Sequence, residues 1–597
     1  MRRTVDPAGC VPVTMCLPGV SRVSRILPGV RHWKRYVAIA LALVLVLVVI
    51  RVVYNIRHRP QPGGIAMSPG PVLITPAVSP VPTAGPRTLY VIDAPSLINW
   101  AHRDPGELMT ARAIQGIVNR DQPSIFILVD RQGVHDQDWL NLLKKSYKAS
   151  IVDKPDSIKR IHDLTWYIQN FRASFAGYVL FDFPSSARGG PSSSVALSLA
   201  GVLNAIPIER GDSTLIDAAK AAGLQQLEDV SDRGYSWLKA SRYWKMFNRE
   251  AIHMNRPDNL YLGGDYAVAL RMATFWDDVR TDPNMQTMES MLADQRPGGT
   301  VFGWGYTDEQ YREDVFVAVA SRHNQVVTPL PPNISVYAHY PVDRSLPISP
   351  PPALPTDTHK HYVAFVYSDG DNPAVVFNEL TDPGNDRYAS PFRGKVPVGW
   401  TLPPSIPLFA GPIVSQIYAT ASPADVFVAG PSGYGYAFPS LIPGKQLFAA
   451  QTQTTMSSLG LSTILILDMD GSGFSHAALD PLTAQANVNG VFFTAFNGRG
   501  QPPFGSVLWS SGKPVLPTVT LQRTSTQSDD FIVNRAVTYL NSLPTDATAA
   551  SGYSVVYVDF WSISMTDLHR IMTGLNPNLA VVRPDVLAAM ARAHIRH

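Results

Sequence analysis

The second half of the chain repeats one pattern, a short apolar run typical of a buried parallel β-strand. These runs cover residues 361–367, 424–429, 463–468, 489–494, 514–520, 553–559 and 579–583, with a further candidate near 396–400. Helical patterns between them include residues 531–543 and 585–593. Seven or eight such units favour a (β/α) barrel-like domain over residues 360–597. An open doubly wound sheet is the alternative, because a sequence does not show whether a sheet closes.

Residues 87–345 also alternate between the two kinds of element. Strand-like runs cover 88–93, 124–129 and 177–182, and helical patterns cover 107–119, 194–205, 235–254 and 266–279. This alternation predicts an N-terminal α/β domain with a mostly parallel sheet. A proline-rich linker at residues 346–359 separates it from the barrel-like domain.

An apolar run near the N-terminus predicts a single transmembrane helix. The anchor covers residues 36–54, with Trp33, Tyr36 and Tyr54 placed as an aromatic belt. More basic residues precede it, in segment 1–35, than follow it in the proline-rich linker 55–86. The positive-inside rule then predicts a single-pass cell-membrane protein with a cytoplasmic N-terminus and an extracytoplasmic bulk. A cleaved signal peptide is the alternative, although no small-residue cleavage pattern closes the run.

Composition argues against several classes of function. The chain has 597 residues and a net charge of +3, with no basic stripe among aromatic residues, which argues against a nucleic-acid partner. The two cysteines, Cys10 and Cys16, both precede the apolar run, so the folded domains contain no disulfide. An HExxH motif, a histidine-rich metal-binding tract, a serine nucleophile elbow and a Walker loop are missing from the sequence. We therefore predict no metal ion and no cofactor.

Aspartates follow three of the predicted strands. In a barrel the carboxyl ends of the strands form one face, so these carboxylates are candidates for acid–base chemistry there. Two carboxylates two residues apart on an extended chain lie close enough to share a proton or to bind a cation. The alternative is that each caps a turn or a helix. The candidates are Asp369 and Asp371 with the neighbouring Asn372, then Asp468 and Asp470, and finally Asp559.

A glycine- and tyrosine-rich stretch follows the run at 424–429. In Gly433-Tyr434-Gly435-Tyr436-Ala437-Phe438-Pro439, the glycines allow close approach of a ligand and the aromatic rings offer flat faces to a sugar ring. Trp400 and Trp561 extend this predicted substrate-binding surface. The alternative for the tryptophans is the hydrophobic core.

The spacing Gly-x-Gly-Tyr-x-Phe-Pro resembles the signature of the GxGYxYP family of putative glycoside hydrolases, with Phe438 in place of a tyrosine. The acidic turn after His361-Tyr362-Val363 and the run from Gln115 to Arg120 are also similar to that family. The resemblance implies an N-terminal α/β domain followed by a barrel that hydrolyses a poly- or oligosaccharide.

In such an enzyme one aspartate protonates the leaving oxygen and another acts as base or nucleophile. Two alternatives stay open, namely a metal-dependent carbohydrate-modifying enzyme and a non-catalytic glycan-binding protein of the cell surface.

Overall fold

The computed structural model describes one compact unit within residues 75–597. Its described residues are 87–93, 105–128, 136–152, 164–183, 190–256, 262–276, 282–304, 313–343, 346, 349–369, 372–382, 384–469 and 474–595. Among them no helix combines the length and apolar character that crossing a bilayer requires. The predicted anchor at 36–54 and its flanking segments lie outside the described residues.

In the N-terminal part, the described residues form three small parallel sheets where one mostly parallel sheet was expected. Their strand orders are β2-β1-β3, β5-β4-β6 and β10-β9-β7-β8. The strands are β1 (Thr88–Asp93), β2 (Ile125–Leu128), β3 (Ser150–Val152), β4 (Gly177–Phe181), β5 (Ala205–Glu209), β6 (Gln226–Asp229), β7 (Ala251–Met254), β8 (Thr274–Phe275), β9 (Thr300–Gly303) and β10 (Val326–Thr328). Every pairing within these sheets is parallel, as predicted.

Helices connect these strands. They are α2 (Pro105–Val118), α3 (Asp136–Ser146), α4 (Leu164–Asn170), α5 (Pro191–Leu203), α6 (Ser213–Ala221), α7 (Tyr235–Ala240), α8 (Gly264–Ala269), α9 (Asp282–Ala293), α10 (Glu313–Arg322) and α11 (Ile334–Tyr337). Two predicted helices, 235–254 and 266–279, are wrong in their second halves, where β7 and β8 form instead. Both strands are short and buried, and their apolar residues fit a helical pattern equally well.

Helix α2 joins the N-terminal sheets through the run Gln115 to Arg120. The Gln115 amide donates to the Ile125 carbonyl, 3.1 Å away, and to the Asn333 side chain, 2.7 Å away. At Gly116 a Cβ atom would lie 2.3 Å from the Asp265 carbonyl oxygen, so only glycine lets α8 pack this closely. This part of the family resemblance is therefore explained by packing between elements.

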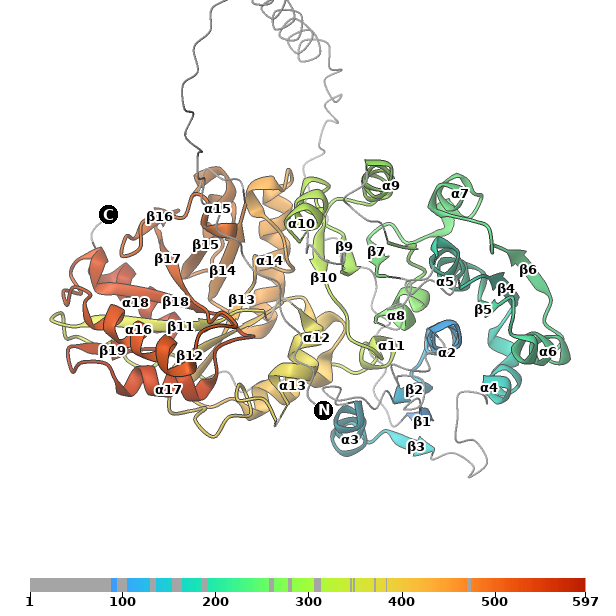
Figure 1. The fold of residues 1–597 in the computed structure, drawn as a ribbon, viewed down its shortest axis with the longest axis horizontal. Helices are drawn as coiled ribbons and strands as arrows, with labels where there is room; N and C mark the ends of the chain where they lie inside the picture. The colour runs from blue at the N-terminus through green and yellow to red at the C-terminus, as the bar shows by residue number, and fades with distance from the viewer. Residues whose placement is uncertain are drawn as a thin grey trace, which may run out of the picture. The chain divides into compact units, whose positions relative to one another are not determined.

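The C-terminal part is a closed parallel barrel of seven strands, which confirms the predicted barrel and excludes the open sheet (Figure 1). Closure comes from β11 and β12, where Phe365 pairs with Val398 and Tyr367 with Trp400. In order around the barrel the strands are β11 (His361–Tyr367), β12 (Val398–Leu402), β13 (Asp425–Ala429), β14 (Thr463–Asp468), β15 (Gly490–Ala495), β17 (Lys513–Leu521) and β18 (Tyr553–Val558).

Among the described residues, two short strands and seven α-helices complete the barrel part. Strand β19 (Leu579–Val581) pairs with the first residues of β11, and β16 (Leu508–Ser510) pairs antiparallel with β17. The helices are α12 (Pro373–Val375), α13 (Gly411–Thr420), α14 (Lys445–Leu459), α15 (His476–Thr483), α16 (Asp529–Asn541), α17 (Met565–Thr573) and α18 (Pro584–His594).

Helix α18 closes the amino-terminal end of the barrel. Its buried residues belong to the same apolar cluster as alternate residues of the strands, among them Val366, Leu465 and Val555. At Gly490, the first residue of β15, a Cβ atom would lie only 2.7 Å from Cβ of Ala588. Because α18 fills this end, the open face of the barrel is the one at which its strands end.

Candidate active site

The barrel interior changes from apolar to polar toward the carboxyl ends of the strands. Successive residues of a strand point to opposite faces, so residues two positions apart face the same way. The residues two positions after the apolar interior side chains, such as Val366, Phe492 and Val555, therefore also face into the barrel. Four of them carry hydroxyl groups, namely Ser368, Thr494, Thr518 and Tyr557, whereas Gly430 and Leu467 stand at the corresponding positions after Val428 and Leu465. The hydroxyls of Thr494 and Thr518 lie 2.7 Å apart. The upper interior is therefore suited to a ligand rich in hydroxyl groups.

Asp559 lies two residues beyond Tyr557 and is half-buried. Its Oδ2 accepts hydrogen bonds from the Ser562 backbone nitrogen, 2.9 Å away, and from the Ser562 hydroxyl. Its Oδ1 has no hydrogen-bond partner among the described residues. The carboxylate thus caps the turn after β18, as the structural alternative predicted, while one of its oxygens is left for another group.

Asp369 follows β11, the strand next to β18. The Ser368 backbone nitrogen donates to the Val558 carbonyl at 3.1 Å, and the Ser368 hydroxyl accepts from the Phe560 nitrogen at 3.3 Å. These bonds bring Asp369 and Asp559 to adjacent strand ends. Asp369 has a φ of +69°, a left-handed conformation that aspartate tolerates better than most residues.

The acidic turn after Asp369 is described only in part. The Asn372 backbone nitrogen donates to the Asp369 carbonyl at 3.3 Å, so Asn372 stays at the same face. The predicted Asp371 lies outside the described residues, as does Asp470 after β14.

Asp468 lies across the barrel from this pair, since β12 and β13 separate β14 from β11. It is buried and accepts hydrogen bonds from the Ser440 hydroxyl at 2.6 Å, the Ser440 nitrogen at 3.1 Å and the Met469 nitrogen at 2.9 Å. These contacts hold the turn that follows Pro439. Asp468 is therefore a structural anchor, and its predicted catalytic role stays a prediction.

The glycine- and tyrosine-rich loop is buried against the N-terminal part. Tyr436 forms an antiparallel bridge with Val327 of β10, through hydrogen bonds of 2.8 and 2.9 Å. Its ring stacks on Trp304 with centroids 6.1 Å apart and an interplanar angle of 14°. The Tyr434 hydroxyl donates to the Gly298 carbonyl at 3.0 Å. Burial raises the pKa of Tyr434 above its usual value, so its hydroxyl stays protonated.

The glycines of this loop permit close packing within the protein. A Cβ atom at Gly433, whose φ is +155°, would lie 2.5 Å from the Phe448 ring, and one at Gly435 would lie 2.7 Å from Val326. Phe438 is fully buried, and its backbone nitrogen donates to the Ser321 hydroxyl at 3.0 Å. The loop thus joins the barrel to the region of β9 and β10. Substrate binding by its residues stays a prediction.

The two predicted tryptophans differ in exposure. Trp400 is fully buried, stacks on Tyr367 at 4.8 Å and donates from Nε1 to Asp425 at 2.9 Å, so it belongs to the core. Trp561 is 60% exposed and lies two residues after Asp559. Of the predicted aromatic set, Trp561 has the ring that is open to a ligand.

The described residues contain no cluster of three or more histidine, cysteine, aspartate or glutamate side chains that could hold a metal ion. Sequence reasoning missed the hydroxyl layer, although the two-residue alternation along each strand would have indicated it. It also missed an arginine-lined cavity of the N-terminal part, because its residues are far apart in the sequence.

Comparison with known proteins identifies the family. Residues 88–170, 175–247 and 250–339 match the first, second and third N-terminal domains of GxGYxYP proteins, and residues 359–592 match the GxGYxYP putative glycoside hydrolase C-terminal domain. The chain therefore belongs to the GxGYxYP family.

A crystal structure of a putative hydrolase from Bacteroides thetaiotaomicron VPI-5482 has the same fold. It is 24% identical, with a TM-score of 0.72, over 85% of this chain and 95% of that one. No match was found among curated proteins.

Proposed function

We propose that this GxGYxYP protein hydrolyses a glycosidic bond of a poly- or oligosaccharide at the carboxyl end of its barrel. The supporting observation is the position of Asp369 and Asp559 on adjacent strand ends, above a layer of hydroxyl groups. The description of the family as putative glycoside hydrolases supports the same reaction class.

In this mechanism the two carboxylates divide the acid–base work. One protonates the oxygen of the leaving sugar while the other activates water or attacks the anomeric carbon. The Ser562 hydrogen bonds orient Asp559 through Oδ2 and leave Oδ1 for the substrate. Asp371 and Asp470 stay candidates from the sequence for a supporting role at the same face.

Trp561 is the proposed stacking residue for a sugar ring. Its exposed indole lies two residues after Asp559, and the intervening Phe560 packs on it with ring centroids 5.4 Å apart. A sugar held against this ring would present its linkage to the aspartates. The hydroxyls of Thr494, Thr518 and Tyr557 supply donors and acceptors for the rest of the ligand.

The test is hydrolysis of a glycan panel by the purified full-length protein, with products identified by mass spectrometry. Once a substrate is found, Asp369→Asn and Asp559→Asn should each lower kcat by about 100-fold or more, the usual size of a lost acid or base. Asp217→Asn, on the exposed surface of α6, removes the same charge and should leave kcat unchanged.

Three outcomes would contradict the proposal. Wild-type turnover in both aspartate variants would show that the chemistry lies elsewhere. Glycan binding without any product would favour the non-catalytic glycan-binding alternative, and activity that is lost on chelation would favour the metal-dependent one.

We further propose that residues 36–54 anchor the protein in the cell membrane, with the barrel outside. The support is the apolar run and its basic N-terminal flank. Extraction of the membrane fraction with alkaline carbonate tests whether the protein is anchored. Treatment of intact cells with protease tests whether the barrel lies outside the membrane. Release by carbonate, or protection of the barrel from protease, would contradict it.

A further inference from the structure

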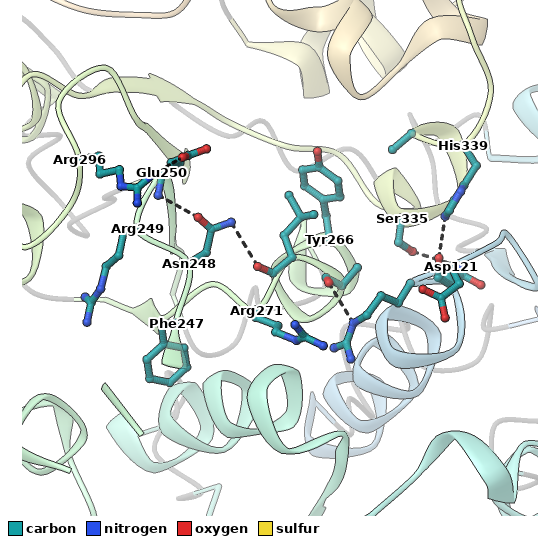
Figure 2. A pocket seen from close by; sticks show the side chains of 15 residues that line it. Asp121, Phe247, Asn248, Arg249, Glu250, Tyr266, Arg271, Arg296, Ser335 and His339 are labelled. Carbon is teal, nitrogen blue, oxygen red and sulfur yellow. Dashed lines mark hydrogen bonds and ion pairs between the residues drawn. The ribbon is translucent and has the colours of Figure 1, made fainter. Parts of the chain in front are cut away.

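A large cavity lies in the N-terminal part, within residues 119–339, and so outside the barrel strands. Its volume is about 690 Å³, within the range of small-molecule sites. It is formed by the end of α2, the segment before β7, the end of α8 and helix α11 (Figure 2). These elements belong to the regions that match three different N-terminal domains of the family.

The lining of this cavity is rich in positive charge. Four arginines line it, against two acids, Asp121 and Glu250. Arg296 is neutralised by Glu250, 2.7 Å away. Arg249 is held by the Trp244 carbonyl at 2.6 Å and lies over the Trp244 ring at 4.6 Å. The positive charge available to a ligand in the cavity therefore comes mainly from Arg120 and Arg271.

Arg120 and Arg271 have no ion-pair partner within 4 Å among the described residues. Arg120 donates to the carbonyls of Gly201 at 2.8 Å, Val268 at 3.1 Å and Ala269 at 3.1 Å, and also to the side-chain oxygen of Asn204, all of which are neutral acceptors. Burial, together with the positive charge of Arg271, lowers the pKa of Arg120 to about 10, although Asp121 opposes this effect.

Arg271 is exposed, and its side chain makes no hydrogen bond within the described part of the chain. Figure 2 shows it among the residues that line the cavity. Because the positive charges of Arg120 and Arg271 repel each other, an anion that binds between the two guanidinium groups is stabilised.

His339 adds an independent polar group to the wall. It is only 2% exposed, and its Nε2 lies 2.6 Å from the Asn119 carbonyl oxygen, so Nε2 carries the proton. Its Nδ1 is then an acceptor, and it has no partner among the described residues. A buried acceptor without a partner is unfavourable, and because neighbouring atoms cover this Nδ1, a ligand hydroxyl group reaches it only when the cavity wall shifts.

We propose that this cavity binds a small ligand in which a carboxylate or phosphate group is attached to a hydroxyl-bearing body, such as an acidic sugar. Arg271 binds the oxyanion, the positive charge of Arg120 attracts it, and His339 accepts a hydrogen bond from a hydroxyl group. Because Arg120 is already committed to backbone carbonyls, Arg271 is the residue that adapts to the ligand. The site is a binding site separate from the aspartates of the barrel, and its existence does not depend on glycoside hydrolysis.

Isothermal titration of the full-length protein tests this proposal with four probes: glucuronate, glucose 6-phosphate, glucose and inorganic phosphate. We expect at least one acidic sugar to bind, glucose not to bind, and inorganic phosphate to bind more weakly than the acidic sugar. The carboxylate and phosphate probes together show which oxyanion the cavity prefers.

Variants locate the bound probe. Arg271→Gln should weaken binding of the acidic sugar by about tenfold or more, the equivalent of one lost charged hydrogen bond. Arg535→Gln on α16 removes the same charge from the barrel part and should bind as the wild type does, as should Asp559→Asn.

Three results would overturn the proposal. The first is that neither acidic sugar binds at about 10 mM, a concentration that detects very weak complexes. The second is equal weakening by Arg271→Gln and Arg535→Gln. The third is loss of binding in Asp559→Asn, which would place the ligand in the barrel.

Discussion

Replacing Tyr434 with phenylalanine tests whether the glycine- and tyrosine-rich loop joins the two parts of the protein or binds substrate. The change removes one hydroxyl group, which donates to the Gly298 carbonyl at 3.0 Å. Gln451 donates to the same carbonyl at 2.9 Å, so that oxygen keeps a partner. The expected loss in the free energy of unfolding is therefore about 1 kcal/mol, without the larger penalty of an unsatisfied buried group.

Urea unfolding followed by tryptophan fluorescence measures this loss, with Tyr539→Phe as the matched control. Tyr539 is 40% exposed, so loss of its hydroxyl should leave stability unchanged. Tyr434→Ala should cost about 3–5 kcal/mol, because it also removes the buried ring that packs on Phe448. Unchanged stability in Tyr434→Phe, combined with a tenfold loss of glycan affinity, would refute the structural role of this loop.

Three further changes test other parts of the structure. Trp561→Ala should weaken glycan binding by about tenfold in titration without changing thermal stability, since the ring is exposed; unaltered affinity would exclude stacking there. Gly490→Ala should destabilise the barrel by about 1–3 kcal/mol in urea unfolding, because its Cβ would collide with Ala588 of α18; a neutral effect would contradict the position of α18.

Burial lowers the pKa of His253 from 6.5 to about 4. The unfolded chain therefore binds a proton at His253 more readily than the folded protein does, and the free energy of unfolding falls as the pH decreases from 6.5 to about 4. His253→Gln should reduce this acid-induced loss of stability by on the order of 3 kcal/mol, whereas His359→Gln on the surface should leave it unchanged. Urea unfolding at a series of pH values measures the loss, and the same pH dependence in the wild type and in His253→Gln would contradict the role of His253.

The strands of the barrel could be predicted because each is an apolar run of the right length. The runs at 361–367 and 463–468 became β11 and β14 without any change of bounds. Closure of the barrel was not visible in the sequence, since it requires β11, the first strand of the barrel, to pair with β18, the last, which lies far along the chain. The division of the N-terminal strands among three sheets could not be predicted for the same reason, since it also depends on which strands pair.

The candidate site was harder to predict than the fold. Asp369 and Asp559 were expected at one face because parallel strands end together, and the structure brings them to adjacent strands. The burial of the aromatic loop could not be read from the sequence, because glycine permits close approach of a protein chain as readily as that of a ligand. Tyr434 and Tyr436 face other residues of the protein, and only the positions of Gly298 and Val327 reveal this.

A crystal structure with a bound oligosaccharide product tests the proposed location of the chemistry most directly. We expect a sugar ring against Trp561, with its reducing or leaving end within hydrogen-bond distance of Asp559 and near Asp369. An oligosaccharide found only in the cavity beside Arg271, or on any surface away from the strand ends of the barrel, would contradict this account.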